Sequence, residues 1–160
     1  MQLTRNFTLS EMTKSQTALR LGLDNTPPQG AIASLRLLAA NVLQPVRDHY
    51  SRTVLVSSGY RSPELNARIG GSRTSDHCRG MAADIEVPPT ANYDLATWID
   101  ANLEYTQLIL EFYTRSVPDS GWVHVSYDLS NLKKQNLTAV KTDGKTTYLS
   151  GLHAWVTACP

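Results

Sequence analysis

Two histidines and one aspartate, spaced as the ligands of a metal ion, constrain this chain more than any other sequence feature. Residues 75–84 carry His77 and Asp84, and a second histidine, His124, follows in the run Trp122-Val-His124-Val. Zn2+ accepts imidazole nitrogens and carboxylate oxygens readily, and three protein ligands leave the fourth tetrahedral position open for a water molecule. An open position is typical of a catalytic zinc site. The fold must therefore bring these three side chains together.

Small residues near the constellation favour a tight backbone. Gly80 and the run Met81-Ala-Ala separate the first histidine from the aspartate and let the chain pass close to a metal ion. The alternation in Trp122-Val-His124-Val-Ser126 predicts a short strand that projects His124 from one face. A histidine beside an aspartate is also a common hydrogen-bonded pair at protein surfaces, so the spacing alone leaves that alternative open.

Further motifs precede and follow the constellation in a fixed order. They are Ser58-Gly59-Tyr60-Arg61-Ser62, Gly70-Gly71-Ser72, the run from His77 to Asp84, Leu108-Ile-Leu-Glu111-Phe112 and Trp122-Val-His124. In these motifs the chain resembles the zinc D-alanyl-D-alanine carboxypeptidase family, whose members cut peptidoglycan stem peptides and include many phage endolysins. The resemblance covers residues 7–126, and its S-G-Y-R-S and S-x-H-x-x-G-x-A-x-D patterns are specific in combination.

The resemblance implies a Zn2+ ion bound by His77, Asp84 and His124, a carboxylate base, and an oxyanion-stabilising cation at Arg61. It also implies a hedgehog/D-Ala-D-Ala-peptidase-like fold. Arg61 follows an expected strand at residues 53–58, so a rigid sheet could aim its guanidinium group at a substrate carboxylate or an oxyanion. The alternative is a surface ion pair, which contributes about 0–1 kcal/mol to stability.

The general base departs from the pattern of several branches of the family. Those branches carry a carboxylate three residues before the last histidine, where this chain has Gly121. We expect Glu111 to be the base, because the branch with a Gln-Leu-Ile-x-Glu-Phe strand resembles this chain best. Asp119 is the alternative, although Pro-Asp-Ser-Gly is also an ordinary turn sequence. The strand pattern places Leu108, Leu110 and Phe112 on one face and Gln107, Ile109 and Glu111 on the other.

These residues suggest a hydrolytic mechanism. Zn2+ lowers the pKa of a water molecule toward ~7, Glu111 accepts its proton, and the resulting nucleophile attacks a peptide carbonyl polarised by zinc and Arg61. Glu111 then passes the proton to the leaving amine. The resemblance implies peptidoglycan stem peptides as substrates and leaves D-Ala-D-Ala, L-Ala-D-Glu and cross-link bonds open. A non-catalytic, zinc-stabilised module that binds cell wall or peptide is the alternative, and Gly121 favours it.

Composition limits the remaining classes of function. The 160 residues suit one domain spanning 1–160, and we expect a monomer. A net charge of +1 with no basic run argues against nucleic-acid binding, and no apolar run is long enough to span a membrane. The first ten residues lack the apolar core of a secretory signal. We therefore expect synthesis in a host cytoplasm and action on the cell wall or periplasm, with a bacterial enzyme whose signal was removed as the alternative.

The two cysteines and the two other histidines are not assigned to the metal site. Cys78 adjoins His77, but neighbours in an extended loop point apart, and an isolated cysteine usually acts as a small buried apolar residue. A disulfide between Cys78 and Cys159 is possible, although nothing in the sequence supports it. His49 ends a helical pattern, where a surface role is the default. His153 could cover the site from the C-terminal segment, but a structural role is more common.

The coarse secondary structure predicts the α+β class, with a small antiparallel sheet and flanking helices around the zinc site. A capping box at Thr8-Leu-Ser-Glu11 starts a short helix, and Pro45 should kink the helical pattern at 30–49 or mark a junction of two helices. Ser62-Pro63 starts another short helix, and Asp143-Gly144 is a strong hairpin signal. Strands are expected at residues 53–58, 82–87, 106–113 and 121–127 and around the hairpin, and a helix at 91–103.

Overall fold

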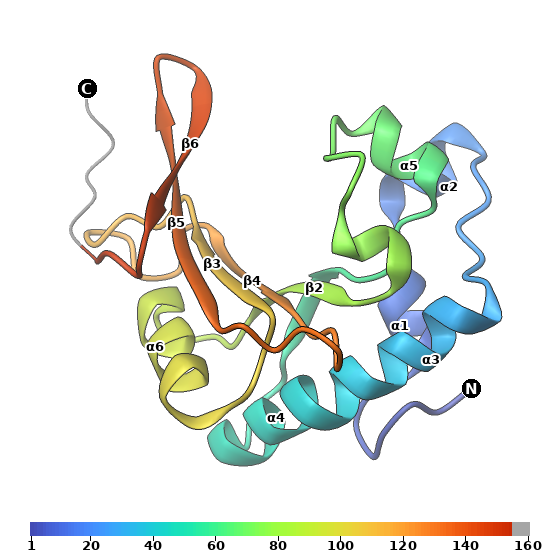
Figure 1. The fold of residues 1–160 in the computed structure, drawn as a ribbon, viewed down its shortest axis with the longest axis horizontal. Coiled ribbons are helices and arrows are strands. Elements are labelled where there is room, and N and C mark those ends of the chain that lie inside the picture. The colour runs from blue at the N-terminus through green and yellow to red at the C-terminus, as the bar shows by residue number, and fades with distance from the viewer. Residues whose placement is uncertain (155–160) are drawn as a thin grey trace.

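A mixed sheet of six strands forms the centre of the molecule, in the order β1-β2-β4-β3-β5-β6. The computed structural model describes residues 1–154 and confirms the α+β class. Helices cover one face of the sheet, and the β5–β6 hairpin rises from its end (Figure 1). The strands are β1 (Leu55–Ser58), β2 (Ala82–Glu86), β3 (Gln107–Glu111), β4 (Trp122–Ser126), β5 (Gln135–Thr142) and β6 (Lys145–Ser150).

Four of the five strand pairings are antiparallel as expected, but β3 and β5 run parallel. The reason is the segment at 127–134, which carries the chain from β4 past β3 to the sheet's other side. Since β3 and β4 are antiparallel, a strand that returns beside β3 must share its direction. The local sequence predicts where each strand lies. The pairing of β5 with β3, by contrast, depends on the connection between β4 and β5.

The three central strands bury alternate side chains against the helices. Every core-facing side chain of these strands is fully buried. Burying a side chain the size of Leu or Val stabilises a fold by about 1.5–3 kcal/mol relative to leaving it exposed. The period of two thus assigns one face to the core and leaves the other free for polar side chains. The core-facing residues are Ala83, Ile85, Leu108, Leu110, Val123 and Val125.

Short helices start where the sequence places capping residues. The Thr8 hydroxyl accepts a hydrogen bond from the Glu11 amide at the start of α1, and the Ser62 hydroxyl accepts one from the Leu65 amide at the start of α5. Within residues 1–154 no helix is long and apolar enough to cross a membrane. The helices are α1 (Leu9–Thr13), α2 (Gln16–Leu21), α3 (Gln29–Leu38), α4 (Gln44–Tyr50), α5 (Pro63–Arg68) and α6 (Asn92–Asn102).

The helical pattern at 30–49 is divided into two helices, which is one of the two outcomes expected at Pro45. A π-helical turn, η1 (Ala39–Leu43), joins α3 to α4, and the Gln44 amide bonds the Ala39 carbonyl five residues back. Proline lacks an amide proton, and its ring collides with the carbonyl four residues earlier. One wider turn just before Pro45 relieves that collision while the apolar stripe stays on the core.

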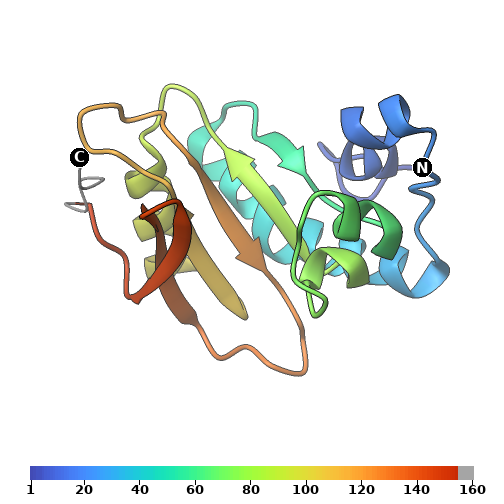
Figure 2. The same ribbon diagram turned by 90° about the horizontal axis from the view of Figure 1, so that it is seen from above.

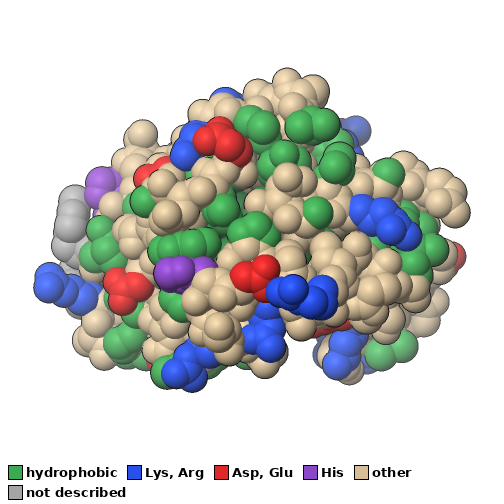
Figure 3. Space-filling view, turned by 90° about the horizontal axis from the view of Figure 1, so that it is seen from below, with side chains coloured by type: hydrophobic (Ala, Val, Ile, Leu, Met, Phe, Trp, Pro, Cys, Tyr) green, Lys and Arg blue, Asp and Glu red, His purple; other side chains and the backbone are tan. Residues whose placement is uncertain are grey.

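On the helical side of the molecule, acidic, basic and apolar side chains are interspersed (Figure 3).

A close approach of two chain segments fixes the turn from β3 to β4. Gly121 has φ +65°, and a Cβ there would overlap the carbonyl oxygen of Glu111. The Asn92 side chain donates to the Gly121 carbonyl at 3.1 Å and anchors the turn. The expectation that Phe112 continues the apolar face of β3 is wrong. The strand ends at Glu111, and Phe112 adopts φ 54° with its ring edge-on to Trp122.

This packing predicts that alanine is costly at Gly121. Gly144 provides a matched control, because it also has positive φ, +75°, but open space surrounds its missing Cβ. Gly144→Ala should lose about 1–2 kcal/mol for the left-handed backbone. Gly121→Ala should lose about 1–3 kcal/mol more, because the neighbouring backbone must also move. Urea unfolding of both variants measures the difference, and equal losses would contradict the close approach.

Candidate functional site

His77, Asp84 and His124 direct three ligand atoms at one point. His77 Nε2 lies 3.2 Å from His124 Nδ1 and 3.3 Å from Asp84 Oδ1. His124 Nδ1 lies 2.9 Å from the same oxygen. Zinc bonds of about 2.0–2.1 Å at tetrahedral angles place ligand atoms about 3.3 Å apart. The three spacings therefore match one face of a zinc tetrahedron, and the group could hold a metal ion.

The sheet and one short helix set this geometry. Asp84 on β2 is the direct cross-strand partner of His124 on β4, so both side chains project from the same face. His77 comes from a 3-10 helix, η2 (Asp76–Arg79), rather than from an extended loop. Gly80 ends that helix with φ +70°, and a Cβ there would overlap the Ala31 carbonyl. The tight turn expected at this glycine is thus present.

A backbone carbonyl orients the ring of His77. Its Nδ1 lies 2.7 Å from the Gly59 carbonyl oxygen, which can only accept a hydrogen bond. Nδ1 therefore carries the proton, and Nε2 turns its lone pair toward His124 and Asp84. Such a partner on the far nitrogen is typical of metal-binding histidines, since it fixes both the tautomer and the ring orientation.

The cluster is almost inaccessible to solvent, with 2 %, 6 % and 8 % of His77, Asp84 and His124 exposed. Burial lowers the pKa of His77 and outweighs the opposing effect of Asp84. Burial alone would raise the pKa of Asp84, but the two histidines hold it below its usual range. For His124, the bond and charge of Asp84 outweigh burial and raise its pKa. A buried carboxylate between two imidazoles is a set of ligands that can bind a divalent cation.

Arg61 lines the site and is bonded to the aspartate. Its Nη2 donates to Asp84 Oδ2 at 2.7 Å, and its Nε donates to the Ser58 hydroxyl at 2.8 Å. Arg61 thus holds the carboxylate oxygen that faces away from the histidines. A guanidinium group has five N–H donors, so these two bonds leave others for a substrate. Its role toward an oxyanion stays a prediction.

The cluster lies at the floor of an open cavity of about 570 Å3. Its lining residues come from the sheet, from the loop after α5 and from the β5–β6 hairpin. Figures 1 and 2 show α5 and the hairpin on either side of the sheet face that α3, α4 and α6 leave uncovered. The loop after α5 forms one side, and the segments after β4 form the other. Its lining includes Gly70, Ser72, Gln107, Ile109, Trp122 and Tyr148.

Glu111 also lines the cavity, on the face predicted for it. It pairs across the sheet with Trp122, two residues before His124, which makes it a diagonal neighbour of that histidine. Diagonal neighbours are about 7–8 Å apart at Cα, a gap that long side chains reach across. Burial raises the pKa of Glu111, and the charge of Asp84 raises it further against His124 and Arg61. A carboxyl group with a raised pKa beside a metal site suits a general base.

The other candidate residues lie apart from the cluster. Asp119 is exposed in the turn before Gly121 and does not line the cavity. Cys78 is half-buried, and burial raises the pKa of its thiol. Cys159 lies outside the described residues, so the disulfide stays untested. His49 stacks on Trp98 with ring centroids 4.2 Å apart. His153 donates its backbone amide to the Thr138 hydroxyl and does not line the cavity.

Sequence reasoning missed three contributors to the site. The Gly59 carbonyl orients His77, and the Ser58 hydroxyl holds Arg61. Both belong to the Ser58-to-Ser62 motif. The sequence therefore identified the segment but not the roles of these two residues. Tyr148 belongs to the predicted hairpin, but its position on the cavity depends on the parallel pairing of β3 and β5. No local pattern encodes that pairing.

A family model described as Peptidase M15 matches residues 5–126. The matched range contains the whole cluster, Arg61 and Glu111. It ends before the β4–β5 segment and the hairpin. A comparison with curated proteins gives no match.

The geometry predicts one tightly bound zinc ion per chain. His77→Ala and Asp84→Asn each remove a ligand, so zinc content after dialysis should fall at least about tenfold. His49→Ala, which changes a histidine outside the cluster, should keep its zinc. Elemental analysis gives the zinc content, and circular dichroism checks that the variants stay folded, because a core of this size should not need the metal. Full zinc content in both cluster variants would contradict the assignment of these residues as zinc ligands.

Proposed function

Because the chain belongs to the peptidase M15 family of metallopeptidases, we propose that it hydrolyses an amide bond in the stem peptides or cross-links of bacterial peptidoglycan. The observation that carries the proposal is the cluster of His77, Asp84 and His124, set beside Glu111 in an open cavity. Three converging ligands with a carboxylate nearby are the parts that a hydrolytic metal site needs.

The residues of the chain divide the work of hydrolysis. His77, Asp84 and His124 would hold the zinc ion, which supplies Lewis acidity to the attacked carbonyl and acidifies the attacking water. Glu111 accepts a proton from that water and returns it to the leaving amine, because it is the one carboxylate in the cavity lining, within residues 1–154, that lacks a basic partner close enough for an ion pair. Arg61 keeps the Asp84 carboxylate in place and offers its remaining N–H groups to the substrate.

A second cavity supports cleavage within a peptide rather than only at its end. It has a volume of about 550 Å3 and shares Arg61, Asp84 and Trp122 with the first. The two cavities therefore adjoin each other at these three residues, beside the cluster. A substrate can extend on both sides of the scissile bond, as an endopeptidase requires and a carboxypeptidase does not.

The alternative is a module that binds zinc and cell-wall peptide without cutting. Gly121 favoured it, because the base of several family branches is missing at that position. The structure gives Gly121 another reason, the close approach to the Glu111 carbonyl, and places the Glu111 side chain in the cavity. The observed geometry thus favours the enzyme.

We place this activity in a phage endolysin, since the resembled family includes many of them. Such an enzyme is made in the host cytoplasm and reaches the cell wall when a separate protein permeabilises the membrane. Expression of the chain in bacteria should cause lysis only when such a protein is co-expressed. Lysis by the chain alone would contradict this setting.

Hydrolysis of purified peptidoglycan tests the proposal itself. The zinc-loaded protein should release soluble peptides, a chelator should stop the release, and added zinc should restore it. Mass spectrometry of the fragments identifies the bond that is cut, and internal cleavage is the expected result. A zinc-loaded, folded protein that binds peptidoglycan without releasing fragments would establish the binding module instead.

The role of Glu111 predicts a separation of metal binding from turnover. Glu111→Gln keeps the shape and the zinc content, but turnover of cell-wall peptides should fall by about 10²–10⁴. Asp119→Asn should stay near wild type, since that side chain is exposed outside the cavity. Zinc content and hydrolysis are measured side by side for both variants. The opposite ranking would transfer the role to Asp119.

A further inference from the structure

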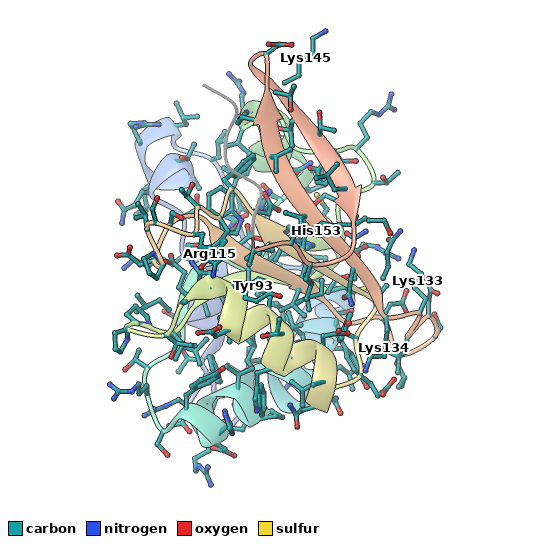
Figure 4. The ribbon with its side chains drawn as sticks, turned by 90° about the vertical axis from the view of Figure 1, so that its left-hand side faces the viewer. Tyr93, Arg115, Lys133, Lys134, Lys145 and His153 are labelled. Carbon is teal, nitrogen blue, oxygen red and sulfur yellow. The ribbon has the colours of Figure 1, made fainter. Side chains whose placement is uncertain are left out.

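The C-terminal part of the chain contributes to the cavity although the family match ends at residue 126. Asn131 and Lys133 line it from the segment between β4 and β5, and Tyr148 lines it from β6. Figure 4 shows Lys133 near the base of the hairpin and Lys145 at its tip. The hairpin therefore contributes to the cavity through its second strand, β6.

Strand register places Tyr148 in the same row as the expected base. Trp122, Glu111, Ala139 and Tyr148 are successive cross-strand partners on β4, β3, β5 and β6. Partners in register project from the same face of a sheet. Two aromatic side chains thus flank Glu111, with only the small Ala139 between Glu111 and Tyr148.

Solvent exposure distinguishes the residue of this row that is packed by its neighbours from the residue that is free to contact a ligand. Ala139 is fully buried although it projects from the cavity face, so its neighbours cover it. Tyr148 is 54 % exposed, and it is the one residue of β6 that lines the cavity. Burial raises the pKa of its hydroxyl, and the charge of Glu111 adds to this rise, which is consistent with their proximity. The side chain is therefore accessible to a molecule in the cavity.

We propose that Tyr148 is a substrate-binding residue whose ring, opposite Trp122, holds the peptide over Glu111. The inference rests on the proposed function and adds a contact from outside the family-matched range. Aromatic rings offer a large, rigid contact area at low entropic cost. A peptide between the two rings would have its scissile bond within reach of Glu111 and the cluster.

Binding measured without turnover tests this role. In a Glu111→Gln background, calorimetry gives the Kd for a purified peptidoglycan peptide that the wild type cleaves. Tyr148→Ala should weaken binding about tenfold, whereas Tyr148→Phe, which keeps the ring, should stay near the background value. Thr147→Ala is the matched control, because it changes the next residue of β6, whose side chain projects from the opposite face.

Steady-state kinetics in the wild-type background provides the second readout. Loss of a contact that is made equally before and during the reaction raises KM and leaves kcat nearly unchanged, so Tyr148→Ala should raise KM about tenfold. Zinc content should not change. If Tyr148→Ala binds and cleaves like Thr147→Ala, the inference is overturned while the proposed function stands. If the wild type neither binds nor cleaves the peptide, the proposed function fails and the inference fails with it.

Discussion

The Asp84 carboxylate is the interaction on which the site depends. One oxygen lies within 2.9 Å of His124 Nδ1 and 3.3 Å of His77 Nε2, and the other accepts from Arg61 at 2.7 Å. These partners come from β4, from η2 and from the segment after β1, so one buried anion joins three parts of the chain. Removing a partner from a buried ion pair typically costs about 3–5 kcal/mol, because a charge stays buried without compensation. The same anion supplies the charge that makes the cluster attractive to a cation.

The position of the expected base follows from backbone packing rather than from a motif. At Gly121 the chain passes so close to the Glu111 carbonyl that no side chain fits, and the left-handed backbone there also favours glycine. A carboxylate three residues before His124 is therefore excluded by sterics. Glu111 on the neighbouring strand is paired with Trp122, one residue beyond Gly121, so its side chain reaches the same region from β3. The same close approach thus explains why residue 121 is a glycine and why Glu111, on the adjacent strand, lies near the cluster.

Most of the fold and of the candidate site could be predicted because their signals are local. Capping residues set the starts of α1 and α5, alternation assigned Glu111 to the cavity face, and Asp143-Gly144 signalled the hairpin. The failures arise where distant segments meet. Phe112 leaves the strand because the turn at Gly121 constrains it, and the parallel pairing of β3 with β5 depends on the path of the 127–134 segment. Neither constraint leaves a periodic trace in the sequence.

The same division separates chemistry from recognition. The matched range, residues 5–126, holds every residue of the cluster and the expected base. Alternation along β2, β3 and β4 places Asp84, Glu111 and His124 on one face, and η2 adds His77 to it. That face is open, because α3, α4 and α6 lie on the other side (Figure 2). A flat metal site alone would bind a peptide weakly, since contacts on the sides of a cavity supply most of the buried ligand area. The loop after α5 forms one side, and the hairpin that the parallel β3–β5 pairing places beside β3 forms the other. The one pairing that the local sequence does not encode is thus what turns a metal-binding face into a cleft.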